Sequence, residues 1–122
     1  MAQNKIEKFG PVFLAAAAAD ILNPADAGAG HVGYTPTASY IILRHIRIVN
    51  KTAGAVTFSL FIGATGGSLA GTEFMGFGKS IAANSHEDWY GMLILKTTDF
   101  LTGLASAANS LTFQAEGEIG LL

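Results

Sequence analysis

The last third of the chain alternates apolar and polar residues with a period of two, and this pattern constrains the fold more than any other feature. From Leu111 to Leu121 the odd positions are apolar or small, and the even positions are mostly polar. Successive side chains of a β-strand point to opposite faces, so the pattern places one side of the segment on a core and the other in water. It predicts a half-buried strand over residues 111–121.

Two similar segments lie in the middle of the chain. Residues 39–49 are rich in β-branched side chains and predict a central strand, but Arg44 interrupts the alternation. Either a bulge near Leu43–His45 shifts the register, or both faces of the strand are covered. Residues 56–62 alternate cleanly, and Asn50–Gly54 has the composition of a turn. We therefore predict that the two strands form an antiparallel hairpin.

Further short strands are expected around Glu73–Phe77, Glu87–Lys96 and Phe100–Ser106, separated by turn residues. Six to eight short strands with such spacing indicate an all-β fold, either an antiparallel β-sandwich or a flattened, jelly-roll-like barrel. We expect almost no helix. Residues 1–33 are predicted to form an N-terminal arm with a short strand and a loop, and residues 34–122 a β-sandwich domain.

The chain carries few charges for its apolar content. Of its 122 residues, 50% are hydrophobic and 13% are charged, whereas a soluble domain usually has about a quarter charged residues. This shortage predicts that other chains cover part of the apolar surface, and hence a homo-oligomer. The alternative is that alanine and glycine raise the apolar fraction without creating an adhesive surface.

The net charge of −2 and the dispersed basic residues exclude a nucleic-acid binder, which needs a basic surface to displace counterions from phosphates. The chain has no cysteine, so disulfides and thiolate metal sites are excluded. The apolar run Val12–Ala19 is shorter than the ~20 residues of a membrane span. It follows two lysines as in a signal peptide, but Glu7 and Gly10-Pro11 interrupt that pattern. We expect no contact with a membrane.

The three histidines do not have the spacing of a metal site. His31, His45 and His86 are scattered, and only His86 has acidic neighbours, Glu87 and Asp88. That group could hold a cation at a subunit contact, but we interpret it as a solvated loop before a strand. His45, close to two arginines, is interpreted as an outward polar residue. We expect no bound metal and no cofactor.

No arrangement of residues indicates catalysis. Serines are plentiful, but none lies on a predicted strand–turn–helix elbow. Glu116 and Glu118 share one side of a strand, ~7 Å apart. This spacing overlaps that of inverting glycosidases, but we interpret the pair as solvent-facing charges of an edge strand, where charge discourages wrong pairing. We expect the protein not to be an enzyme.

Several apolar and aromatic residues are candidates for contacts with other chains. Phe61 lies on the polar side of its strand, and Trp89 and Tyr90 occupy opposite faces of theirs, so one ring of that pair points outward. Alternatively, the arm of the same chain covers these rings, or Trp89 and Tyr90 form a platform for carbohydrate. The predicted interface residues are Phe9, Val12, Phe13 and Leu14 in the arm, with Phe61 and Tyr90 as interface aromatics.

Several segments between residues 38 and 120 carry a resemblance to a known group of proteins. They are Ile42–Thr52, Val56–Ile62 with Gly63-Ala64 and Thr72-Glu73, Ser80–Asn84 before the Trp89-Tyr90 strand, Thr98–Ser106, and Leu111–Gly117. Together they resemble small virion proteins of tailed bacteriophages, of the type that decorates or cements a capsid.

This resemblance implies a β-sandwich that binds the major capsid protein and braces neighbouring capsomers, often as a trimer. It implies a location in the virion, with assembly in the host cytoplasm. Related modules also occur in tails, baseplates and head-fibre bases, so those locations remain alternatives. A carbohydrate-binding β-sandwich is a further alternative from a different class.

Overall fold

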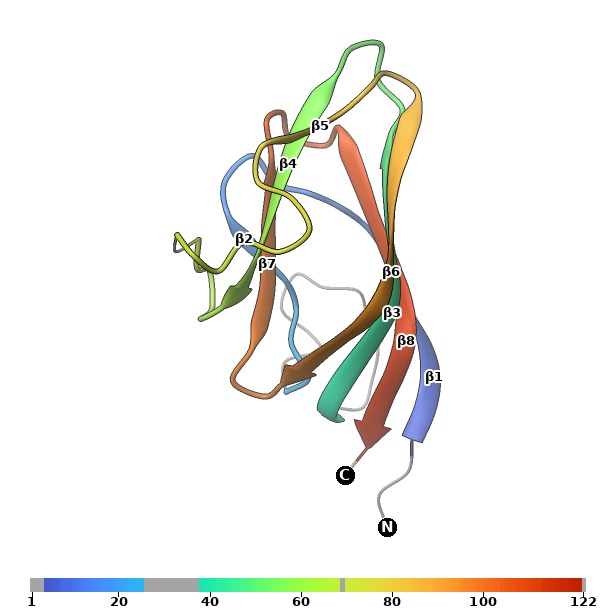
Figure 1. Cartoon of the computed structure of the whole chain (residues 1–122), viewed down its shortest axis with the longest axis vertical. Coiled ribbons are helices and arrows are strands. Elements are labelled where there is room, and N and C mark those ends of the chain that lie inside the picture. The colour runs from blue at the N-terminus through green and yellow to red at the C-terminus, as the bar shows by residue number, and fades with distance from the viewer. Residues whose placement is uncertain (1–3, 26–37, 69, 122) are drawn as a thin grey trace.

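The computed structural model consists of two four-stranded antiparallel sheets that pack face to face (Figure 1). It describes residues 4–25, 38–68 and 70–121. Sheet A has the strand order β1-β8-β3-β6, and sheet B has the order β2-β7-β4-β5. The strands are β1 (Asn4–Phe13), β2 (Ala19–Leu22), β3 (Ala38–Asn50), β4 (Val56–Gly63), β5 (Lys79–Ile81), β6 (Ser85–Lys96), β7 (Phe100–Ala105) and β8 (Leu111–Leu121).

The predicted antiparallel β-sandwich is therefore confirmed, and its eight strands lie within the expected number. The described residues contain no helix. It follows that no helix among them is long and apolar enough to cross a membrane.

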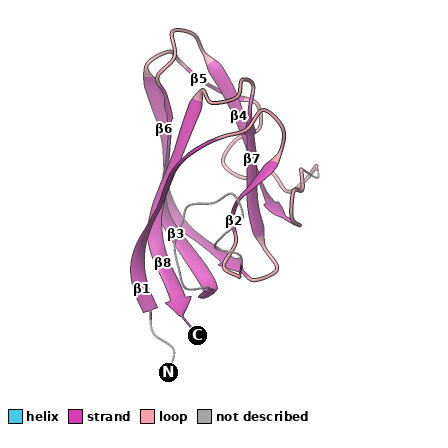
Figure 2. Ribbon diagram, turned by 180° about the vertical axis from the view of Figure 1, so that it is seen from behind, coloured by secondary structure: helices cyan, strands magenta, loops and turns pink. Residues whose placement is uncertain are grey.

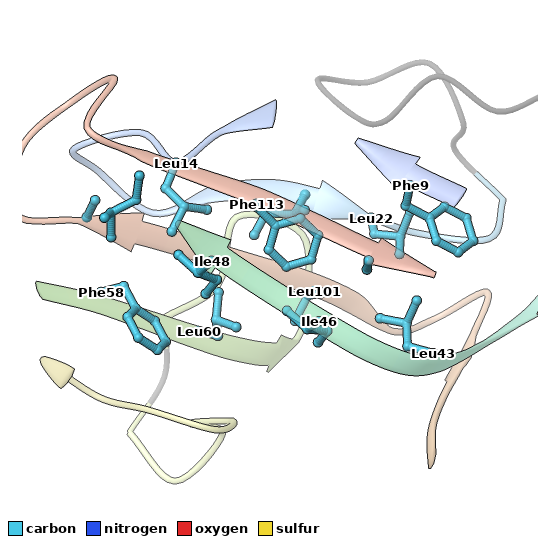
Figure 3. Close-up of a cluster of buried hydrophobic side chains, with 14 of the residues drawn as sticks. Phe9, Leu14, Leu22, Leu43, Ile46, Ile48, Phe58, Leu60, Leu101 and Phe113 are labelled. Carbon is cyan, nitrogen blue, oxygen red and sulfur yellow. The ribbon is translucent and has the colours of Figure 1, made fainter. Parts of the chain in front are cut away.

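The hydrophobic core lies between the two sheets (Figure 3). Phe113 of β8 and Ile46 of β3 extend from sheet A, and Phe58 of β4 and Leu101 of β7 extend from sheet B, all fully buried. The odd positions of β8 from Leu111 to Ile119 are buried, as their alternation predicts. Each large apolar side chain removed from water stabilises the fold by roughly 1.5–3 kcal/mol.

The described part of the expected N-terminal arm, residues 4–25, is instead part of the sandwich, while the predicted boundary between residues 33 and 34 and His31 lie outside the described residues. β1 pairs with β8 almost along its whole length, and β2 pairs with β7. A register shift between Phe9 and Val12 turns both side chains toward the core although they are three positions apart. Gly10 makes the shift possible, because it has φ +94° and a Cβ there would lie 2.7 Å from the Phe113 carbonyl oxygen. Simple alternation does not reveal a strand with such a bulge.

The predicted hairpin of residues 39–49 and 56–62 is wrong, because β3 and β4 belong to different sheets. The turn after β3 carries the chain from sheet A to sheet B. Its shape depends on Asn50, whose buried amide donates to the carbonyl oxygens of Gly54 and Ile81, both at 2.9 Å. Asn50 Oδ1 accepts from the backbone N–H of Thr52 at 2.9 Å. The residues that favour a hairpin turn thus also build a connection between sheets.

The bulge near Leu43–His45 is confirmed, since β3 changes register there with both of its neighbours. Leu43 and Ile46 consequently both face the core, and His45 faces outward.

Two further expectations differ from the structure. Residues 73–77 form no strand, and only Glu73 makes an isolated bridge, with Phe61 of β4. β8 lies between β1 and β3, so Glu116 and Glu118 are on an inner strand and not on an edge.

Candidate functional site: the outward face of sheet A

The outward side of sheet B is covered by the connection between β4 and β5 (Figure 1). Phe61 points to this side and is 2% exposed, with Phe77 edge-to-face at a centroid distance of 6.3 Å. The backbone N–H of Gly78 donates to Ser59 Oγ at 2.8 Å, and Thr102 Oγ1 donates to the Gly67 carbonyl oxygen at 2.6 Å. The chain therefore buries this side of sheet B by itself.

The outward side of sheet A is not covered by any part of the chain that the structure describes. In Figure 1 and Figure 2 no described segment lies over it. Six large apolar side chains are exposed among the described residues, and five of them lie on this side, since they alternate along β1 and β6 with core-facing residues. They are Ile6 (86% exposed), Phe13 (57%), Tyr90 (71%), Met92 (59%) and Ile94 (50%). An exposed apolar group confined to one face is typical of an interaction surface.

A network of charged side chains crosses the middle of this face. Asp88 of β6 accepts hydrogen bonds from Arg47 of β3, with Nε at 2.8 Å and the second nitrogen at 3.3 Å. His86 Nε2 lies 3.1 Å from the same carboxylate. His45 lies between two carboxylates, with Nε2 2.9 Å from Asp88 Oδ1 and Nδ1 3.0 Å from Glu116 Oε1. This network joins β6, β3 and β8 across the sheet.

The Tyr90 ring stacks on His45, with the ring centroids 4.5 Å apart and the planes 15° from parallel. Tyr90 thus has one face against the charge network and most of its surface in solvent. A ring held in one orientation loses little conformational freedom when a partner binds it. Tyr90 is therefore an exposed ring held in one orientation.

The environment of the network shifts the pKa values of three members, Arg47, His45 and Asp88, and the hydrogen bond to Asp88 raises the pKa of Arg47. Partial burial alone lowers the pKa of His45, but its hydrogen bonds to Asp88 and Glu116 outweigh that effect and raise the pKa above 6.5. The hydrogen bonds from Arg47 and then from His45 lower the pKa of Asp88 from 3.8 to about 2. Both nitrogens of His45 donate only in the protonated ring, so the two carboxylates favour that form.

These shifts predict a pH window for the stability that the network contributes. The contribution of Asp88 is complete above pH 3.8 and is lost as the pH falls toward 2. The contribution of His45 is complete below pH 6.5 and is lost as the pH rises through the raised pKa. Urea unfolding of the wild type and His45→Gln should show a difference of about 1 kcal/mol or less at pH 6. That difference should shrink by pH 8.5, and a constant difference would contradict the assignment.

Two open hollows adjoin the network. One has a volume of about 360 Å³ and is lined by Lys8, Arg47 and Gln114 beside His45 and Glu116. The other has a volume of about 430 Å³, and Ile6, Arg44, Tyr90 and Glu118 are among its lining residues. No group of three or more His, Asp or Glu residues within the described ranges is arranged to hold a metal ion. The mixture of apolar and charged groups suits binding of another macromolecule.

The structure divides the six predicted interface residues. Phe9, Leu14 and Phe61 are buried by the chain itself, in contrast to the expectation that another chain covers them. The reason is that β1 belongs to sheet A and the β4–β5 connection covers Phe61. Val12 is half-buried against the core. Phe13 and Tyr90 are exposed on the outward side of sheet A.

Sequence reasoning did not select Ile6, Met92 and Ile94. A usable signal is present in β6, where Tyr90, Met92 and Ile94 make the outward side of the strand apolar as well as the inward side. Ile6 is a single apolar residue among charged ones, which gives no such signal.

Two other interpretations of β6 are corrected. His86, Glu87 and Asp88 lie in the strand and not in a loop before it. Trp89 points to the inner side of the sheet, where it packs edge-to-face on Phe74 with the ring centroids 5.1 Å apart. Trp89 and Tyr90 therefore do not form one platform for a sugar ring.

No protein-family model matches the chain, and no curated protein matches it significantly. Among solved structures, the chain is similar to one of the infectious bursal disease virus Gt strain, with 9% identity and a TM-score of 0.33 over 99% of this chain and 31% of the other. A structure of the Gx strain gives 9% identity and a TM-score of 0.33 over 96% of this chain and 28% of the other. The chain spans less than a third of the length of either. An identity of 9% with a TM-score of 0.33 does not indicate a shared function.

Proposed function

We propose that this chain is a non-enzymatic structural protein of a virus particle, a capsid decoration or cement protein that binds the major capsid protein of a tailed phage. The observation that carries the proposal is the gathering of five of the six exposed large apolar side chains on the outward side of sheet A. The resemblance of residues 38–120 to small phage virion proteins supports the same class of function. The low fraction of charged residues is also consistent with it.

In this proposal the protein binds by burial of surface and performs no chemistry. Ile6 and Phe13 at one edge of the face and Tyr90 near the other supply apolar area. The charges between them, already paired within the chain, fix the orientation of the contact. In a homo-oligomer, binding of one copy raises the effective concentration of the others at the capsid surface, so several weak contacts add up to firm binding. Copies bound to different capsomers would then brace them.

The test is co-sedimentation with empty capsids of the phage that encodes the chain. Wild-type protein should bind, and Ile6→Lys should bind at least tenfold more weakly, because it places a charge on an apolar side chain of the proposed contact that is 86% exposed. Phe77→Lys is the matched control: Phe77 is 70% exposed but does not lie on sheet A, so binding should be unchanged.

The proposal is overturned if wild-type protein does not bind, or if both variants weaken binding equally. The number of copies per virion separates the proposed role from a tail, baseplate or head-fibre-base role. Decoration requires hundreds of copies, and a few copies would contradict it.

A further inference from the structure

β6 is an edge strand of sheet A, and no other strand of the described residues pairs with its second edge. It pairs with β3 on one side, and the strand order places no strand on the other. Among the described residues, its backbone hydrogen bonds outside the sheet are confined to Lys96. The Lys96 N–H donates to Asp99 Oδ2 at 3.0 Å, and its carbonyl oxygen accepts from the Asp99 N–H at 2.9 Å.

These bonds show which backbone groups point to the free edge. Lys96 directs both its N–H and its C=O away from β3. Backbone direction alternates with the same period as side-chain direction along a strand. Tyr90, Met92 and Ile94 have the same parity as Lys96, and their side chains all point outward. The register against β3 shifts between Tyr90 and Leu93, but the alternation of outward and core-facing side chains continues through this shift. By this alternation, the N–H and C=O groups of Tyr90, Met92 and Ile94 point to the free edge as well.

The other three sheet edges carry features that discourage pairing, and β6 lacks them. β2 and β5 are only four and three residues long. β1 contains Pro11 and the charged residues Lys5, Glu7 and Lys8. β6 has twelve residues without proline, and the seven from Trp89 to Leu95 carry no charge. A long, apolar, unprotected edge pairs readily with another strand.

The sequence of β6 is complementary to itself when two copies run antiparallel about a two-fold axis at Met92. On the outward side, this register places Met92 opposite its own copy and Tyr90 opposite Ile94 of the second copy. It places the acid Asp88 opposite the base Lys96. Each pair is favourable, since apolar residues meet apolar residues and opposite charges meet.

The neighbouring registers are less favourable. An axis at Gly91 places the Asp88 carboxylate opposite Ile94. An axis at Leu93 places the ammonium group of Lys96 opposite Tyr90 and leaves Asp88 opposite Thr98, beyond the end of the strand. The register about Met92 also brings Trp89 opposite Leu95 on the inner side, where both side chains already pack on the core.

We propose that two copies of this chain associate through their β6 strands, antiparallel and with Met92 on the two-fold axis, so that the two A sheets become one continuous sheet. The contact does not depend on a capsid and leaves Ile6 and Phe13, at the opposite edge, free. It favours a two-fold contact in place of the three-fold one that the resemblance to phage proteins implies.

Sedimentation equilibrium of the full chain tests the state of association. Wild-type protein should have twice the mass of the 12.6-kDa chain. Met92→Lys should dissociate at least tenfold more readily, because it places two like charges opposite each other. Its urea unfolding midpoint, measured with both proteins monomeric by dilution, should stay near that of the wild type, since Met92 is 59% exposed. Ile6→Lys should remain a dimer.

Cross-linking tests the register. The chain has no cysteine, so single cysteines can be introduced without competing thiols. Met92→Cys should form a covalent dimer on mild oxidation, because directly opposed residues of an antiparallel pair have Cα atoms about 5.5 Å apart, within disulfide range. Ile94→Cys should not, since its two copies are offset by four residues, about 13 Å. A monomer, a trimer, or equal cross-linking at both positions would overturn the proposal.

Discussion

Replacing Gly117 with alanine should destabilise the protein by about 3 kcal/mol or more. A Cβ at this position would collide with the carbonyl oxygen of Ile42, and it would lie 2.9 Å from Leu43 Cα. These are backbone atoms of β3 at its bulge, so no side-chain rotation can relieve the contact. β3 and β8 would have to separate in the middle of sheet A. Urea unfolding followed by the fluorescence of Trp89, the only tryptophan, measures the loss.

The matched control for this variant is Gly54→Ala. Nothing lies within 4 Å of a Cβ at Gly54, and its backbone does not have a positive φ. We expect the free energy of unfolding to change by less than about 0.5 kcal/mol. If Gly117→Ala were as mild as this control, the close approach of β8 to the β3 bulge would be wrong.

Replacing Asn50 with alanine should cost about 3 kcal/mol, because it leaves several backbone groups without partners. The Asn50 amide donates to the carbonyl oxygens of Ile81 at 2.9 Å and Ala82 at 3.2 Å as well as to that of Gly54. Its oxygen accepts from the N–H of Thr52 at 2.9 Å. The side chain is fully buried, so water cannot replace these bonds without opening the turn between the sheets.

Thr52→Ala provides the comparison for the Asn50 variant, measured by the same urea unfolding. It removes the hydroxyl that donates to Asn50 Oδ1 at 2.7 Å, but it keeps the backbone N–H bond to the same oxygen. Thr52 is half-buried, so we expect a loss of about 1 kcal/mol. Equal effects of the two variants would indicate that the amide of Asn50 does not hold β3 and β4 in their connection.

Gly117 supports the proposed interaction surface as well as the fold. Gly117 allows β8 to lie close to the β3 bulge, and that bulge turns His45 outward toward Asp88 and Glu116. The charge network that orients Tyr90 therefore depends on backbone geometry in the middle of sheet A. A change at Gly117 should disturb binding as well as stability, whereas Ile6→Lys should disturb binding alone.

Local alternation determined much of the fold. β8 is recognisable because apolar and polar residues alternate along it, and β6 because apolar residues occupy both of its sides. The break at Arg44 coincides with the bulge of β3. Side-chain direction within a strand depends only on neighbouring residues, so sequence carries it directly. The same reasoning shows that one of Trp89 and Tyr90 points outward, and the structure identifies it as Tyr90.

Tertiary structure alone decided which strands pair and which apolar residues stay exposed. The turn chemistry of residues 50–54 does not distinguish a hairpin from a connection between sheets. Asn50 fixes the connection by hydrogen bonds to Ile81 and Ala82, 31 and 32 residues away. Phe61 is outward by alternation but buried by a later segment of the chain. His45 meets Asp88 and Glu116 across 43 and 71 residues. Contacts between distant residues depend on the order of strands in the sheets, and alternation along one strand carries no information about that order.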